Sequence, residues 1–169
     1  MHLSLINLSD ALSLLEFERQ NKDWFDQFIP PREAEFYSLN GVKQHIRELL
    51  LDYHSHEMLP MLIKDGRQIV GRINVSEIEH GKRSALLGYR VGQEHINKGV
   101  AKWAVSKMIE QLSDMGINQI VAHASPDNPA SCCVLEKNGF VSIELIENFA
   151  CLNGEAIHCY KYVLDIPEK

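Results

Sequence analysis

The segment LGYRVGQEHINKGVA, residues 87–101, joins a predicted strand to a predicted helix and guides the interpretation of the whole chain. The beginning of a helix leaves main-chain N–H groups without partners and carries partial positive charge, so it favours a bound anion. Gly99 and Ala101 lack the bulk that would keep a phosphate away from these groups. The junction therefore indicates a pyrophosphate site, although many strand-to-helix turns contain a glycine for steric reasons alone.

After this junction, the hydrophobic pattern predicts a helix and then a buried strand. Seven apolar residues recur at helical spacing before Gly116 and form one face of the helix. They are Ala101, Ala104, Val105, Met108, Ile109, Leu112 and Met115. Residues 117–124 have the composition of a buried strand.

The carboxyl-terminal part is predicted to form a second helix and a hairpin. Asn128-Pro129 combines an N-cap residue with a proline suited to the first helical turn, and this helix is expected to end near Gly139. Residues 140–149 and 156–164 flank Asn153-Gly154, a dipeptide typical of tight turns between strands.

The first third of the chain has mainly helical patterns. Residues 12–19 mix polar and apolar faces, whereas residues 42–53 carry a clear apolar stripe. Residues 21–32 are predicted to be a connector, because Pro30-Pro31 cannot continue a helix. Its aromatic side chains are expected to hold it against the body of the protein.

Between these helices and the junction, the pattern changes to that of strands. Residues 69–75 alternate apolar and polar side chains, as a half-buried strand does. Turn-forming residues at 64–67 and 79–82 flank this strand, and a further apolar run follows at 85–91. Three antiparallel strands are therefore expected.

Composition favours a single domain over residues 1–169 and a cytoplasmic protein. The 169 residues are 45% hydrophobic, which is enough for a core without metal or disulfide cross-links. A formal charge of −6 disfavours direct nucleic-acid binding. The sequence has no leader and no apolar run of membrane-spanning length, so no membrane partner is expected. The four cysteines lack paired spacing and are interpreted as reduced thiols.

Three segments resemble the GNAT N-acetyltransferase superfamily. Residues 96–101, INKGVA, are similar to its pattern Gln/Arg-x-x-Gly-x-Gly/Ala, with Ile96 in place of the usual polar residue. Residues 128–140 resemble the N-x-x-S…E-K-x-G-F region of the ribosomal-protein-alanine acetyltransferase subgroup, and residues 18–32 resemble its amino-terminal region. The dinucleotide and Walker glycine patterns are absent from the sequence.

The resemblance implies an α/β fold with a central mixed, mostly antiparallel sheet, splayed central strands and helices on both faces. Acetyl-coenzyme A would lie between the splayed strands, where backbone groups of Arg90, Val91 and Gly92 would pair with its pantetheine arm. The residues expected to bind it are Arg90, Val91, Gly92, Ile96, Asn97, Lys98, Gly99, Val100, Ala101, Lys102, Asn128 and Ser131. No metal is expected.

The resemblance also suggests which residue protonates the departing thiolate. Many superfamily members carry a tyrosine one turn after the position of Ser131, but here that position is Leu135. Ser131 is therefore the substitute acid that the subgroup suggests, and Asn128 would hold the cofactor or the helix start. For Ser131, the ordinary role of a first-turn helix serine has equal weight, whereas for Asn128 an N-cap role can coexist with cofactor binding.

A general base is harder to name, because residues 85–91 contain no carboxylate or histidine. Glu77 and His123 on predicted strands are the candidates retained, and His158 on the last strand is a further one. Each is also compatible with a purely structural role, and bulk water is the alternative proton acceptor.

The expected activity is transfer of an acetyl group from acetyl-coenzyme A to a primary amine by direct attack of the amine. The subgroup suggests the N-terminal alanine of a protein, for example a ribosomal protein, as acceptor. A small amine such as a polyamine, an amino acid or an antibiotic is the alternative within the same class. A non-catalytic acyl-coenzyme A sensor is the alternative outside it, and a homodimer is left open.

Overall fold

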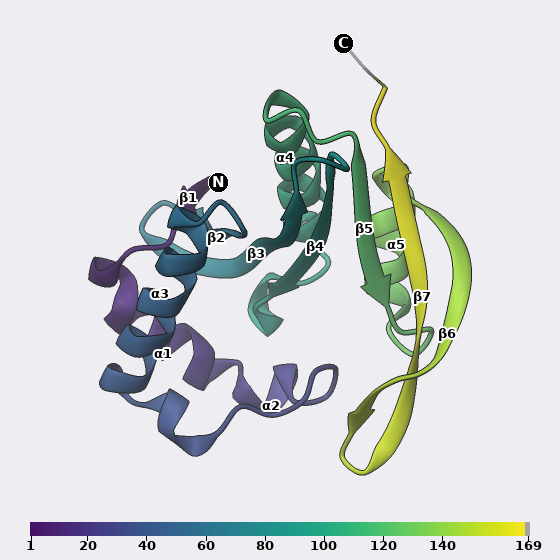
Figure 1. The fold of residues 1–169 in the computed structure, drawn as a ribbon. Helices are drawn as coiled ribbons and strands as arrows, with labels where there is room; N and C mark the ends of the chain where they lie inside the picture. The colour runs from purple at the N-terminus through teal and green to yellow at the C-terminus, as the bar shows by residue number, and fades with distance from the viewer. Residues whose placement is uncertain (168–169) are drawn as a thin grey trace.

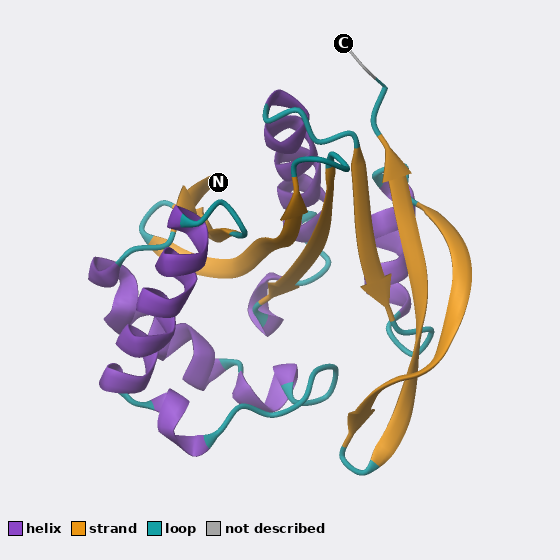
Figure 2. Ribbon diagram, in the orientation of Figure 1, coloured by secondary structure: helices purple, strands orange, loops and turns teal. Residues whose placement is uncertain are grey.

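The computed structural model describes residues 1–167 and contains one seven-stranded sheet in the order β1-β2-β3-β4-β5-β7-β6 (Figures 1 and 2). The neighbouring strands are antiparallel except for the parallel pair β4 and β5. The mixed, mostly antiparallel sheet confirms the predicted fold class. The strands are β1 (His2–Leu5), β2 (Leu59–Asp65), β3 (Gln68–Glu79), β4 (Ser84–Val91), β5 (Gln119–Ala124), β6 (Val141–Leu152) and β7 (Glu155–Asp165).

Helices cover both faces of the sheet, and each face has its own apolar core. One core lies under α1 and α3 and includes Leu62, and the other lies under α4 and α5 and includes Ile63. Neighbouring residues of a strand point to opposite faces, so β2 supplies both cores. The helices are α1 (Ala11–Gln20), α2 (Lys22–Phe25), α3 (Leu39–His54), α4 (Val100–Asp114) and α5 (Pro129–Lys137).

The two central strands diverge partway along their length. Hydrogen-bonded pairing between β4 and β5 runs from Ser84 opposite Gln119 to Leu87 opposite Ala122. Beyond that point β5 continues to pair with β7, while residues 88–91 of β4 pair with β3 alone among the described strands. Figure 1 shows the two strands parting toward the end of β5. This divergence is the splay that the family resemblance predicted.

The elements agree with the sequence patterns except at a few places. The amino-terminal strand β1 was not expected, because its four residues pair only with β2 and form no core pattern of their own. The connector contains the short helix α2, with Phe25 buried. Met115, predicted to lie on the apolar face of α4, is the C-cap residue and is 42% exposed.

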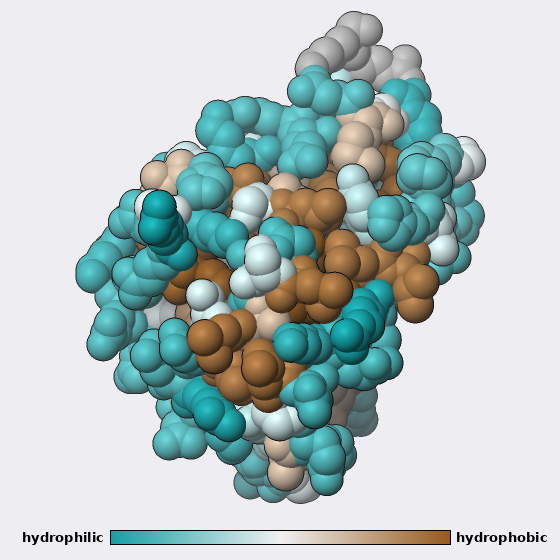
Figure 3. Space-filling view, turned by 90° about the vertical axis from the view of Figure 1, so that its left-hand side faces the viewer, coloured by the Kyte–Doolittle hydropathy of each residue, from teal (hydrophilic) through white to brown (hydrophobic). Residues whose placement is uncertain are grey.

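The outer surface on the α1 and α3 side is mainly hydrophilic, with an apolar area among the polar side chains (Figure 3). The exposed apolar residues of the two helices include Leu12 and Leu51. None of the helices within residues 1–167 is both long and apolar enough to cross a membrane.

Candidate active site

The free edge of β4 forms one wall of the gap between the central strands. The Gly92 N–H donates to the Val70 carbonyl at 2.9 Å, so Gly92 directs its backbone groups toward β3. Alternate residues of a strand direct these groups to opposite edges, so those of Val91 face the gap. Of the three residues predicted to pair with the pantetheine arm, Val91 therefore offers its N–H to a ligand in the gap, whereas the Gly92 N–H is already bonded.

The amino-terminal segment closes over this end of β4. The Val91 carbonyl accepts a hydrogen bond from Trp24 Nε1 at 3.3 Å. The side-chain oxygen of buried Asn21 accepts from the Gln93 N–H at 2.8 Å, while its amide donates to the Phe17 carbonyl. Two residues of the predicted connector thus hold the strand end in place, as expected of a segment held against the body.

The beginning of α4 presents a series of unpaired main-chain donors. The first intrahelical bond runs from the Trp103 N–H to the Gly99 carbonyl. Within residues 1–167, no acceptor is found for the N–H groups of residues 97–102. Gly99 has φ +78°, and a Cβ added there would meet no atom within 4 Å, so no side chain fills this corner. The turn therefore has the donors and the open space that an anionic diphosphate requires.

The side chains of this turn differ in their placement. Val100 is buried in the core, Ala101 is half-buried, and residues 96–99 are exposed. The side chain of Ile96 is 36% exposed, so its replacement of the usual polar residue removes a side-chain ligand but leaves its main chain accessible. The exposed Lys102 contributes a cation near the helix start.

The beginning of α5 brings Asn128 and Ser131 together. The Asn128 side-chain oxygen accepts from the Ser131 N–H at 3.2 Å, which is the N-cap arrangement that sequence predicted. Leu135, at the position of the usual tyrosine, is fully buried in the core. The hydroxyl of half-buried Ser131 is therefore the polar group that this helix can offer at the expected position.

A tyrosine from β4 supports this serine and was missed as a site residue in the sequence. The Tyr89 hydroxyl lies 3.0 Å from Ser131 Oγ and 3.1 Å from the Ser131 carbonyl. Burial raises the pKa of Tyr89 to about 12, so its hydroxyl keeps its proton at neutral pH. Tyr89 and Ser131 are far apart in the chain, and no short-range pattern links them. Together they place two protonated hydroxyls beside the gap.

The opposite face of the sheet presents His123 at the point where the strands part. His123 follows Ala122, the last β5 residue paired with β4. Ala122 and Ala124 face the core under α4 and α5, so His123 faces the other side. Its ring lies 4.7 Å from that of Phe149, and burial together with the Lys161 charge lowers the His123 pKa below 6.5, against an opposing effect of Glu77. The imidazole is therefore neutral at pH 7.

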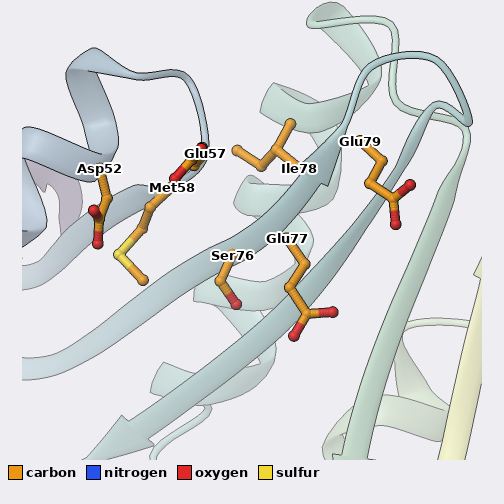
Figure 4. A pocket seen from close by; sticks show the side chains of 7 residues that line it. All are labelled: Asp52, Glu57, Met58, Ser76, Glu77, Ile78 and Glu79. Carbon is orange, nitrogen blue, oxygen red and sulfur yellow. The ribbon is translucent and has the colours of Figure 1, made fainter.

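Glu77, the other predicted base, lies at an irregularity of β3. It has φ +50°, and the β3–β4 register shifts between Ser76 and Glu79. Such a bulge redirects a side chain. Glu77 is exposed and also lines an open acidic depression of about 440 Å³. Figure 4 shows that Asp52 and Glu57 extend into this depression from the end of α3 and the following loop.

Other predicted candidates lie apart from the gap or have structural partners. His158 Nδ1 accepts from the Asn148 N–H at 3.0 Å, where β6 is irregular. Cys132 donates to the Ser125 carbonyl, and Cys133 is exposed. His158 is therefore occupied in the hairpin, and His123 is the histidine that the fold brings to the gap.

Comparison with known proteins agrees with this geometry. Residues 1–141 match the family model described as the acetyltransferase (GNAT) domain. In sequence, the chain is similar to the probable N-acetyltransferase YjcK of Bacillus subtilis, with 25% identity over 153 residues that cover 88% of this chain and 84% of that protein.

Two solved structures have the same fold. The ribosomal-protein-S5-alanine acetyltransferase from Vibrio fischeri has a TM-score of 0.91 at 23% identity, with 99% of this chain and 94% of that chain covered. The microcin C7 self-immunity acetyltransferase MccE, in complex with acetyl-CoA and AMP, has a TM-score of 0.88 at 24% identity, with 97% and 92% covered. With a family model that spans most of its length, this chain belongs to the GNAT family of acetyl-coenzyme A-dependent N-acetyltransferases.

Proposed function

We propose that this N-acetyltransferase acetylates the α-amine of a protein or peptide N-terminus by direct attack of the amine on acetyl-coenzyme A. The observation that carries the proposal is the divergence of β4 and β5 after Leu87, which exposes the Val91 N–H beside the unpaired donors of α4. The Vibrio fischeri protein, named for an alanine of a ribosomal protein, supports a protein N-terminus as acceptor.

The residues beside the gap fit acetyl-coenzyme A. The N–H groups of residues 97–102 would hold its diphosphate, and the Val91 N–H would donate to a carbonyl placed along the free edge of β4. When bound, acetyl-coenzyme A supplies a thioester whose acetyl group passes to the amine and whose sulfur leaves as a thiolate. A fixed N–H donor at the carbonyl favours the charge that develops there.

The two proton transfers of the reaction would take place on opposite faces of the sheet. His123, neutral at pH 7, holds a ring nitrogen able to accept the proton that the amine loses. On the α5 face, the Ser131 hydroxyl would donate a proton to the departing sulfur, and Tyr89 holds this hydroxyl in position through their mutual hydrogen bond. Because Tyr89 keeps its own proton, it can return one to Ser131 after transfer.

Exchange of Ser131 for alanine tests this assignment. We expect the Ser131→Ala variant to lose turnover by about 10²-fold, the lower end for general-acid catalysis. The Michaelis constant for acetyl-coenzyme A should change little, because the diphosphate donors belong to α4. Ser106→Ala, which changes a half-buried serine within α4, is the matched control. An unchanged turnover number in Ser131→Ala would remove this serine from the mechanism.

A small cationic amine is the second candidate acceptor, and the acidic depression beside Glu77 is the observation that favours it. Release of free thiol from acetyl-coenzyme A should be measured with alanine-starting and serine-starting peptides and with spermidine. Faster release with peptides supports the proposal, and faster release with spermidine favours the small amine. Binding of acetyl-coenzyme A without amine-dependent release would instead identify a sensor.

A further inference from the structure

A cluster of guanidinium groups lies on the sheet face covered by α1 and α3. Arg72 of β3 and Arg90 of β4 are cross-strand neighbours, and both contact the same carboxylate oxygen of Glu18 from α1. The distances to Glu18 Oε1 are 2.7 Å from Arg72 Nη1 and 3.1 Å from Arg90 Nη2. Arg72 and Glu18 are almost fully buried, with 2% and 1% of their side chains exposed.

Positive charge in this cluster exceeds negative charge. Arg32, half-buried in the loop before α3, interacts with Arg72 and Arg90 electrostatically, so three guanidiniums share the single carboxylate of Glu18. Two further groups beside these arginines, His45 and Tyr37, carry no charge at pH 7. His45 of α3 contacts Arg72 Nη2 at 2.9 Å with its pKa lowered to about 3, and Tyr37 has a raised pKa. Among the ion pairs of residues 1–167, Glu18 is thus one carboxylate against three guanidinium groups, which leaves an excess of positive charge.

Unused donors accompany this excess charge. The Nε atoms of Arg32 and Arg72 are buried and have no hydrogen-bond acceptor among the described residues. Buried charged donors are normally satisfied, because leaving them unpaired is costly. Burial and the neighbouring Arg72 lower the pKa of Arg90 to about 9, as expected where cations are held close together. An oxyanion would supply both the missing charge and the missing acceptors.

The cluster lies beside the gap between β4 and β5, on the face of the sheet that also carries His123, the proposed proton acceptor. Arg90 directly precedes Val91, whose N–H faces the gap, and its guanidinium stacks 5.0 Å from the Phe25 ring of α2. Tyr89 points to the α5 face, so Arg90 points to the opposite face, the same face as His123. A group held by Arg90 therefore lies on the same face of the sheet as His123, next to the free edge of β4.

We propose that the amine acceptor carries an oxyanion, a carboxylate or a phosphate, a few bonds from its nucleophilic nitrogen. Arg32 and Arg90, with the buried charge of Arg72 behind them, bind this oxyanion and position the amine at the gap. The inference rests on the proposed acetyl transfer and specifies its acceptor: at a protein or peptide N-terminus, the oxyanion is an acidic side chain of the first residues or the carboxyl terminus of a very short peptide. It disfavours a polycationic amine, because such an acceptor would meet uncompensated guanidinium groups.

Matched acceptors that differ only in the anion test the inference. Thiol release should be compared for the dipeptide alanyl-alanine and its carboxyl-terminal amide, and for phosphoethanolamine and ethanolamine. We expect kcat/KM at least tenfold higher for the anionic member of one pair, and the pair that responds identifies carboxylate or phosphate. Equal values within both pairs, or a preference for spermidine, would overturn the inference while leaving acetyl transfer intact. Absence of release with every amine would instead refute the proposed function.

Two variants and a control assign the effect to the cluster. Arg90→Gln leaves the Glu18 and Arg72 pair intact, and Arg32→Gln removes a guanidinium from a half-buried loop residue. Each should lose most of the anion preference, while Arg47→Gln, an exposed position of α3, should retain it. A preference that survives in both cluster variants would overturn the assignment.

Thermal unfolding with inorganic phosphate gives a readout that needs no turnover. Saturating coenzyme A is present throughout, so that the α4 corner is already occupied, and ionic strength is held constant with chloride. Phosphate should raise the melting temperature of the wild type and of Arg47→Gln, but not that of Arg32→Gln. An equal rise in all three proteins would mean that phosphate binds elsewhere and would contradict the inference.

Discussion

The half-buried imidazole of His45 predicts a specific sensitivity of this fold to acid. Its ring lies 5.3 Å from that of Phe36, and Nε2 contacts the Arg72 guanidinium at 2.9 Å. Burial, followed by the charges of Arg72, Arg32 and Arg90, lowers the pKa of His45 from 6.5 to about 3. The folded protein therefore holds a neutral histidine over a pH range in which the unfolded chain binds a proton.

The sign and size of the effect follow from this difference in proton binding. Above pH 6.5 both states are neutral at residue 45 and the full stability is present, whereas at lower pH only the unfolded state gains a proton. The free energy of unfolding therefore falls as the pH decreases toward 3. Between pH 7 and pH 5 we expect a loss of about 2 kcal/mol from His45, at about 1.4 kcal/mol per pH unit below the unfolded pKa.

Urea unfolding in chloride buffers at pH 7, 6 and 5 measures this loss. His45→Gln provides the reference, because glutamine can still accept from Arg72 but does not titrate. The wild type should lose about 2 kcal/mol more than His45→Gln between pH 7 and pH 5, which corresponds to about 4–8 °C in melting temperature for a chain of this size. Parallel pH profiles for the two proteins would refute the reasoning, since His45 would then be protonated in the folded state.

Three further predictions concern the reaction gap. Tyr89→Phe removes the hydroxyl beside Ser131 and should lower kcat by about 2–10-fold, the cost of one lost hydrogen bond. When Tyr89→Phe is added to the Ser131→Ala variant, kcat should fall little further. Additive losses in the double variant would contradict the interaction between Tyr89 and Ser131. Gly99→Ala forces a side chain into a positive-φ conformation. The free energy of unfolding, measured with urea, should therefore fall by about 1 kcal/mol, and acetyl-coenzyme A should bind more weakly. Gly81→Ala, in an open turn, is the control and should change neither quantity. In the wild type, kcat/KM should fall as the pH decreases below 6.5, because the lowered pKa of His123 keeps the imidazole neutral above that pH. The His123→Asn variant should not show this fall. If the fall is unchanged in the variant, water is favoured as the proton acceptor.

Much of the turn at the start of α4 could be predicted because it depends on local chemistry. Residues 96–101 indicated a turn with free N–H groups, and among the described residues no acceptor is found for the N–H groups of residues 97–102. Asn128 was predicted as an N-cap and accepts from the Ser131 N–H. Interactions of this kind span a few residues, so spacing and residue type are sufficient to anticipate them.

The partners of the catalytic candidates could not be predicted in the same way. Tyr89 contacts Ser131 across 42 positions of the chain, and Glu18 contacts Arg72 across 54. Both contacts depend on which face of β3 or β4 a side chain occupies and on which helix covers that face. A strand period shows that residues alternate, but not which neighbours each face will meet.

Most of the helices and strands, the turns and the free N–H groups at the start of α4 follow from short-range patterns in the chain. The divergence of β4 from β5, the separation of hydroxyls and imidazole on opposite faces, and the excess of arginine charge arise when distant segments meet. Turns, helix ends and amphipathic periods involve residues close together in the chain, so they can be recognised from the sequence. Charge balance and strand pairing depend on residues that are neighbours in space, and folding determines which residues become neighbours.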